Sequence, residues 1–190
     1  MRTRYAPLVL ALLFSATAAR ADGPAVATID RVVAVVDDGA ILRSEVIARA
    51  RPLVRGAGKA DVAALYKNVL EVMIEERLIA RRAKELHVTV TDSEIAMAME
   101  RVAQAAGVSR KELDAEVKRQ GMTLAEYQAE LGRQLLEAKW AMIEVRPKVT
   151  TKPKTDKPTP EEERAFGIEM AKRRAEVVAA LRADAYVEVR

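Results

Sequence analysis

Few residues of this chain combine the types and the spacing that catalysis requires. His87 is the single histidine among 190 residues, and cysteine is absent. An imidazole can serve as a general base or a metal ligand, but either kind of site needs several converging groups. The sequence contains no glycine-rich phosphate loop, no zinc-binding helix motif and no nucleophile elbow. We therefore expect no catalytic residue, no metal site and no cofactor.

The acidic residues give little support to acid–base chemistry. Glu75 and Glu76 are neighbours in sequence, and so are the three residues from Glu161 to Glu163. Adjacent side chains on a helix do not face each other. We therefore expect these carboxylates to be solvated surface groups or partners of a helix dipole.

Apolar side chains are the remaining candidates, and their chemistry is binding. Leu136, Trp140 and Ile143 form a second apolar stripe on a helix that already has one. Such a helix either packs on two sides or offers one side to a ligand, and core packing is the commoner outcome. Methionine suits a promiscuous surface because its side chain adapts in shape. The alternative to core packing is a hydrophobic groove for extended segments, and its candidate residues are Met97, Met122, Tyr127, Leu136, Trp140 and Ile143.

The first 21 residues have the layout of a secretory signal peptide. Arg2 and Arg4 precede an apolar run from Pro7 to Phe14, and Ala19-Arg20-Ala21 offers the small-x-small cleavage pattern. The run is too short for a membrane anchor, which needs about 20 apolar residues. We expect cleavage after Ala21, a secreted protein and no membrane span after cleavage.

The mature chain would be nearly neutral and mainly helical. Loss of the three signal arginines lowers the formal net charge from +4 to +1. No basic stripe is visible outside the linker described below, so we expect no nucleic-acid partner. Without cysteine the protein must be stabilised by packing alone. Ala, Glu, Lys, Arg and Leu dominate the composition, which favours helices.

Both ends of the mature chain predict strands. The β-branched run from Ile29 to Val36 precedes Asp37-Asp38-Gly39, a tight-turn signal, and residues 40–42 form a short return strand. The last six residues, Ala185 to Arg190, alternate as a strand does. Because a terminal strand has no local partner, we expect it to complete one small sheet with the hairpin.

Helices are predicted between these strands. Ser44 is expected to cap a helix that ends near Val54, and Asp61 to cap a central helix that ends near Leu86, after a break at residues 56–58. Three capping boxes pair Thr91 with Glu94, Ser109 with Glu112, and Thr123 with Glu126. They predict helices at Asp92–Ala106, Arg110–Gln120 and Leu124–Val145, the first two followed by Gly107 and Gly121 in left-handed conformation.

A segment rich in proline and lysine interrupts the helical pattern at residues 146–160. It has too little apolar content to order itself, so we expect a solvated, semi-extended linker. A last helix is predicted from Glu161 to Asp184, with acidic residues in its first turn.

Four segments carry a family resemblance. Residues 29–46 resemble the opening of SurA-type chaperones, in which a strand, a turn and a second strand lead into a helix. Residues 72–79 and 87–95 resemble the following helices, and residues 181–189 resemble the C-terminal helix and strand. The resemblance implies a mainly α fold: a multi-helix SurA N-terminal-type core with a small sheet formed by the N-terminal hairpin and the C-terminal strand. Residues 22–145 and 161–190 would form that core.

The chain departs from the family between its two matching parts. SurA-type proteins usually carry parvulin-type prolyl-isomerase domains there, whereas this chain has only the linker, which is too short for a domain. The resemblance thus implies a periplasmic, ATP-independent chaperone that binds unfolded outer-membrane or secreted proteins, and not an enzyme. A subunit with one dedicated partner is the alternative, and a prolyl isomerase is a third reading. Exchange of the C-terminal strand between two copies would give a homodimer.

Overall fold

The computed structural model describes residues 30–54, 59–151 and 158–190. The predicted signal peptide and its cleavage site lie outside these residues, as do the predicted helix break and the middle of the predicted linker. Within the described ranges, no helix is both long enough and apolar enough to cross a membrane.

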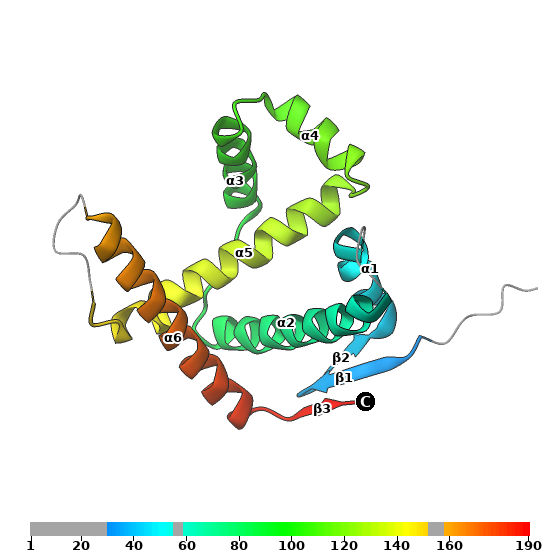
Figure 1. Cartoon of the computed structure of the whole chain (residues 1–190), viewed down its shortest axis with the longest axis vertical. Coiled ribbons are helices and arrows are strands. Elements are labelled where there is room, and N and C mark those ends of the chain that lie inside the picture. Colours follow the sequence, from blue (N-terminus) through cyan, green and yellow to red (C-terminus); the bar gives the residue numbers. More distant parts are fainter. Residues whose placement is uncertain (1–29, 55–58, 152–157) are drawn as a thin grey trace, which may run out of the picture.

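A three-stranded antiparallel sheet joins the two ends of the described chain (Figure 1). Strand β1 (Val32–Val36) lies in the centre, between β2 (Gly39–Leu42) and β3 (Val187–Val189). Ala34 pairs with Ile41 on one side and with Val189 on the other. The predicted closure of the sheet by the C-terminal strand is therefore confirmed.

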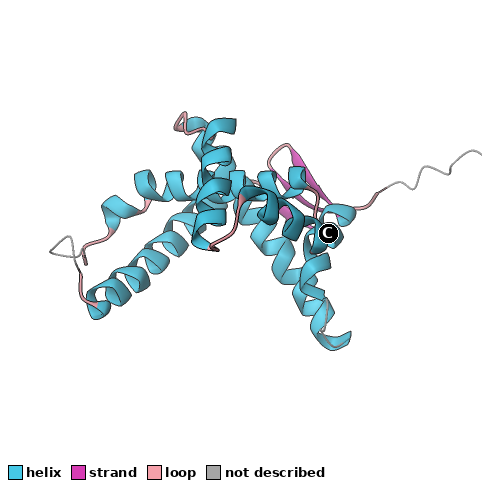
Figure 2. Ribbon diagram, turned by 90° about the horizontal axis from the view of Figure 1, so that it is seen from above, coloured by secondary structure: helices cyan, strands magenta, loops and turns pink. Residues whose placement is uncertain are grey.

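Six α-helices account for most of the remaining described residues (Figure 2). Helix α2 is the central one, because it contacts α1, α5, α6 and strand β1. This position explains its wide apolar stripe, since each side of the helix covers a different neighbour. The bounds are α1 (Arg43–Val54), α2 (Lys59–Glu85), α3 (Asp92–Ala105), α4 (Arg110–Arg119), α5 (Leu124–Glu144) and α6 (Pro160–Asp184).

The three predicted capping boxes are all present, at the starts of α3, α4 and α5. Gly107 and Gly121 follow α3 and α4 with φ of 68° and 83°, the left-handed conformation that was predicted. A fourth box starts α6, where Thr159 pairs with Glu162 and proline occupies the first helical position. Its Thr-x-x-Glu spacing is the same as in the other three.

Two predicted caps were wrong. Ser44 lies inside α1, and its hydroxyl bonds the carboxylate of Asp30 instead of a free N–H of the helix. The Glu45 carboxylate accepts from the N–H of Leu42 at 2.7 Å. Asp61 likewise lies inside α2 and not at its cap position. It belongs to the first turn, where the helix dipole stabilises a carboxylate.

The predicted linker is ordered at its start. Residues Arg146–Lys148 form a 3₁₀ turn, and the Val149 side chain is only 2% exposed. The backbone N–H groups of Thr150 and Thr151 donate to the carboxylate of Glu169 in α6, at 3.0 and 2.6 Å. The expectation of a solvated, semi-extended segment is therefore wrong at its start, where residues 146–148 form a turn and Val149 is buried, although the other side chains of residues 146–151 are exposed. The carboxylate of Glu169 docks this start onto α6.

Most of the buried apolar side chains of the described residues fall into three clusters. The first unites the sheet, α1 and α2, which together we call the base, with the end of α6. The second, around Trp140, joins α2, α5 and α6. The third joins α3, α4 and the start of α5, which we call the lobe. Figure 1 shows the lobe standing away from the base, with α5 connecting the two.

Candidate binding groove

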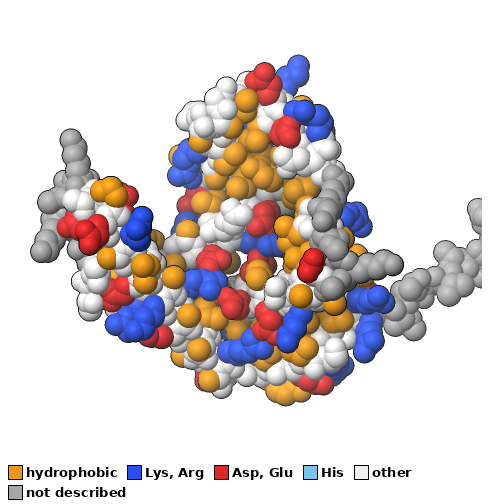
Figure 3. Space-filling view, viewed as in Figure 1, with side chains coloured by type: hydrophobic (Ala, Val, Ile, Leu, Met, Phe, Trp, Pro, Cys, Tyr) orange, Lys and Arg blue, Asp and Glu red, His pale blue; other side chains and the backbone are white. Residues whose placement is uncertain are grey.

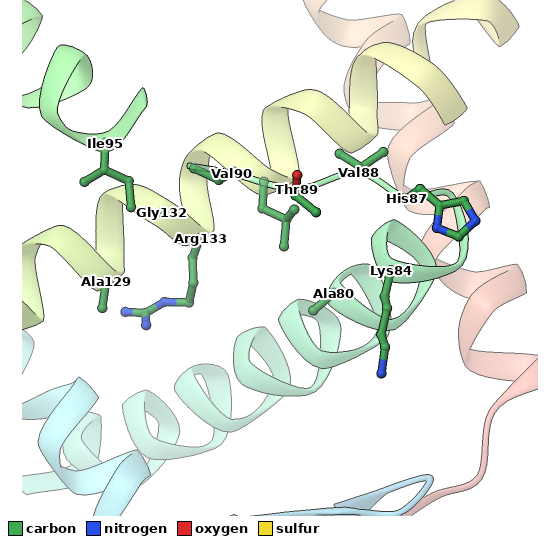
Figure 4. A pocket seen from close by; sticks show the side chains of 11 residues that line it. Ala80, Lys84, His87, Val88, Thr89, Val90, Ile95, Ala129, Gly132 and Arg133 are labelled. Carbon is green, nitrogen blue, oxygen red and sulfur yellow. The ribbon is translucent and has the colours of Figure 1, made fainter. Parts of the chain in front are cut away.

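An apolar groove of about 630 Å³ lies between α2, the start of α3 and the middle of α5 (Figure 4). Its walls come from three separate parts of the sequence, including the connection between α2 and α3. The lining residues are Ala80, Lys84, His87, Val88, Thr89, Val90, Ile95, Ala129, Gly132, Arg133 and Leu136.

Small residues create the space and set its shape. Ala80 on α2 and Ala129 on α5 fill little of the gap between the two helices. On the α3 side, a Cβ atom added to Gly132 would lie 3.4 Å from Cδ1 of Ile95, so glycine permits a close approach of the two helices there.

The end of α2 positions the apolar wall. His87 has a φ of 55° and follows the last turn, where the N–H of Val88 donates to the carbonyl of Ala83 at 2.8 Å. This left-handed helix end redirects the chain. The following residues then run along α5, and Val88 and Val90 form one side of the groove.

Charged groups fix the rim of the groove. The ammonium group of Lys139 donates to the carbonyl of Thr89 at 2.7 Å and pairs with Glu94 at 2.6 Å. Hydrogen bonds from Lys139 and from the N–H of Thr91 lower the pKa of Glu94 to about 2. Glu94 thus stays ionised at neutral pH and ties the start of α3 to α5. No acidic side chain is among the groove-lining residues.

A network of four ionised side chains lies beside the groove. The guanidinium of Arg49 on α1 pairs with Glu76 on α2 at 2.7 Å and also with Glu130 on α5. Arg133, which lines the groove, pairs with Glu130 at 2.6 Å and lies 3.7 Å from Glu76. Burial raises the pKa of Glu76, against the charges of the two arginines. Sequence reasoning missed this network, because nothing in the sequence places the three helices together.

The six predicted binding residues do not share one surface. Leu136 lines the groove. Met97 is 61% exposed on α3 and Ile143 is 51% exposed on α5, and neither lines the groove. Met122 and Tyr127 pack half-buried against the lobe cluster.

The prediction that Trp140 lines a binding groove is wrong. Its side chain is fully buried in the cluster that includes Ile79 of α2 with Val177 and Val178 of α6. A ligand cannot reach it unless α6 moves away. The second apolar stripe of α5 therefore divides, with Trp140 in the core and Leu136 in the groove. The groove residues on the α2–α3 connection were not predicted, although the Val88-Thr89-Val90 run marks them as apolar.

The structure places the other chemical candidates apart. His87 is exposed on the groove rim, where its backbone conformation ends α2. Glu75 pairs with Arg174 of α6, whereas its neighbour Glu76 pairs with Arg49 of α1, so the two carboxylates point to different elements. The described residues contain no group of three or more acidic or histidine side chains that could hold a metal ion.

Comparisons with known proteins agree on one family. The family described as SurA N-terminal domain matches residues 29–140. Proteins named Chaperone SurA are similar to this chain: the one from Cupriavidus metallidurans is 37% identical over 112 residues, and the one from Ralstonia nicotianae is 35% identical over 126 residues. These matches cover 56% and 64% of this chain but only 23% and 25% of the relatives, so the chain spans about a quarter of their length.

A solved structure shows the same fold. It comes from a study of two structurally related SurA-like chaperones of Campylobacter jejuni. It superposes with a TM-score of 0.54 over 84% of this chain and 98% of its own, at 11% sequence identity. The arrangement of helices and the small sheet is therefore shared, although few residues are.

Proposed function

The chain belongs to the SurA N-terminal domain family, and from that premise we propose that it is a periplasmic chaperone that binds unfolded outer-membrane or secreted polypeptides. Relatives named Chaperone SurA support the chaperone role. Binding would need no ATP, because it would use a preformed apolar surface. The proposed location rests on the signal-like residues 1–21.

The observation that carries this proposal is the open apolar groove. Its volume of about 630 Å³ lies in the range of about 300–1,000 Å³ that is typical of ligand pockets. Val88, Val90, Ile95 and Leu136 would contact apolar side chains of a client, and the small residues leave room for bulky ones. Such contacts do not depend on a particular sequence, which suits a protein with many clients.

The test is suppression of aggregation. A urea-unfolded outer-membrane protein is diluted into buffer with the purified protein, and light scattering is followed. We expect suppression at a near-stoichiometric ratio. Leu136→Glu should lose most of it, since a carboxylate in the groove would have to be desolvated when a client binds. Met142→Glu is the matched control, because Met142 is 52% exposed on the same helix and does not line the groove.

Three results would redirect the proposal. If the wild-type protein suppresses no aggregation, the groove serves one dedicated partner, which a pull-down from periplasmic extract would identify. If the two variants lose equal activity, another surface binds the client. Catalysis of a proline-limited refolding reaction by the purified protein would instead assign it to the isomerases.

A further inference from the structure

Among the described residues, the buried apolar cluster of the lobe is separate from that of the base. The base cluster contains no residue of α3, α4 or α5, and the lobe cluster contains no residue of the sheet, α1 or α2. Near its C-terminal end, α5 is fixed by Trp140, which is buried against α2 and α6. From there α5 and α2 diverge toward α1 (Figure 1). The apolar clusters therefore attach α5 to the base near its C-terminal end, whereas the cluster at its start attaches it to α3 and α4. Ion pairs join the region between these two ends to the base.

These ion pairs belong to the four-residue network. Arg49 reaches from α1 to Glu130 on α5, and Arg133 reaches from α5 to Glu76 on α2. Acidic and basic side chains gather between the lobe and the base in Figure 3. The four side chains are 24% to 41% exposed, so water and salt reach them. Partly exposed ion pairs weaken as salt screens them, whereas the apolar clusters do not.

The network also borders the groove. Arg133 belongs to both, and Figure 4 shows its side chain extending from α5 toward α2. Its contact with Glu76 therefore joins the two helices that flank the groove, while its pair with Glu130 lies within α5. If α5 swung outward about its anchored end, the groove would widen toward α1.

We propose that Arg49, Glu76, Glu130 and Arg133 form an ion-pair clasp that holds the lobe against the base and limits the opening of the groove. This inference rests on the proposed function only where it concerns clients. Release of the clasp lets the lobe move outward and admits a larger client segment. Client binding and lobe opening are then linked, so each favours the other.

The absence of cysteine makes the lobe movement directly measurable. Ala48→Cys on α1 and Ala115→Cys on α4 place two spin labels at exposed positions of the base and the lobe. Double electron–electron resonance then gives their distance distribution. Raising NaCl from about 0.1 M to about 1 M shortens the Debye length from about 10 Å to about 3 Å. We expect longer and broader distances at high salt.

Substitution of one clasp residue, Arg49, tests the same movement at constant salt. Arg49→Met keeps an apolar stem of similar length and removes the charge. It should reproduce the high-salt distribution at 0.1 M NaCl, with circular dichroism confirming the fold. Arg119→Met is the control, since the ion pair of Arg119 with Glu116 lies within α4. Unchanged distances in both high salt and Arg49→Met would overturn the clasp.

A measurement of client binding distinguishes a failure of this inference from a failure of the proposed function. Arg49→Met should bind a labelled unfolded outer-membrane protein about fivefold more tightly or better, the lower end of ordinary coupling between sites. Equal or weaker binding by the variant would overturn the link between clasp and client. If neither protein binds the client, the proposed function fails, and the distances alone decide whether the clasp exists.

Discussion

The backbone N–H of Tyr186 donates to Oδ1 of Asp37 at 3.0 Å, across 149 positions of sequence. The N–H of Asp37 returns a bond to the carbonyl of Tyr186 at 2.8 Å. Oδ2 of the same carboxylate accepts from Arg81 of α2 at 3.0 Å. One turn residue therefore connects the N-terminal hairpin, the central helix and the C-terminal strand.

This connection predicts an unequal effect of removing charge from the hairpin turn. Asp37→Asn puts an amide opposite Arg81 and should lower the free energy of unfolding by about 1.5–3 kcal/mol, the range for a hydrogen bond to a charged group. Asp38→Asn removes the same charge from an exposed neighbour and should change it by no more than about 0.5 kcal/mol. Urea unfolding measures both, and equal effects would contradict the role of Asp37.

The docked start of the linker predicts a pH dependence. Hydrogen bonds from the Thr151 side chain and from the N–H groups of Thr150 and Thr151 lower the pKa of Glu169 to about 2, from an ordinary 4.5. Since the folded pKa is the lower one, this stabilisation is complete above about pH 4.5 and is lost as the pH falls toward 2.

Glu169→Gln tests that dependence. The variant should be less stable than the wild-type protein at pH 6, and the difference should shrink as the pH approaches 2. Urea midpoints at a series of pH values measure this, with Glu163→Gln, an exposed carboxylate in the first turn of α6, as the control. A difference that stays constant with pH would rule out the proposed bonds of the carboxylate.

The left-handed backbone conformation of His87 predicts that glycine at this position stabilises the protein. Its φ of 55° is unfavourable for a residue with a Cβ atom and ordinary for glycine. His87→Gly should raise the free energy of unfolding by about 0.5–1 kcal/mol, after the entropy that glycine loses on folding is counted. His87→Ala removes the imidazole but keeps the Cβ atom, so it should bring no gain. If both variants behave alike, the backbone conformation is not the cause.

Trp140 predicts a spectroscopic result, because it is the one tryptophan of the chain. A fully buried indole should emit at short wavelength and resist acrylamide quenching until urea unfolds the protein. Trp140→Ala should cost about 3–5 kcal/mol, as large-to-small core substitutions do. Efficient quenching in the native protein would instead place the indole at an accessible surface.

Local signals explain what could be predicted from the sequence. The boxes at Thr91, Ser109 and Thr123 were predictable because their partners lie three residues away. The box at Thr159 carries the same signal and was overlooked. Ser44 was misplaced because a serine near a helix start is ambiguous by one or two positions, and its actual partner, Asp30, precedes the hairpin.

Tertiary contacts explain why other features could not be predicted from the sequence. Trp140 and Leu136 lie one helical turn apart on α5, yet α6 covers the first and leaves the second in the groove. No periodicity within α5 distinguishes them, because the covering helix begins some 20 residues later. The ion network has the same origin, since it depends on how α1, α2 and α5 converge.

Site-specific crosslinking tests the central claim, a groove that binds unfolded chains, most directly. A photoreactive probe is attached to single cysteines in the otherwise cysteine-free protein, at Val90 in the groove and at Ile168, which is 66% exposed on α6. Illumination with an unfolded outer-membrane protein should give crosslinks from Val90 and almost none from Ile168. Crosslinks of equal yield from both positions, or from Ile168 alone, would contradict a binding site in the groove.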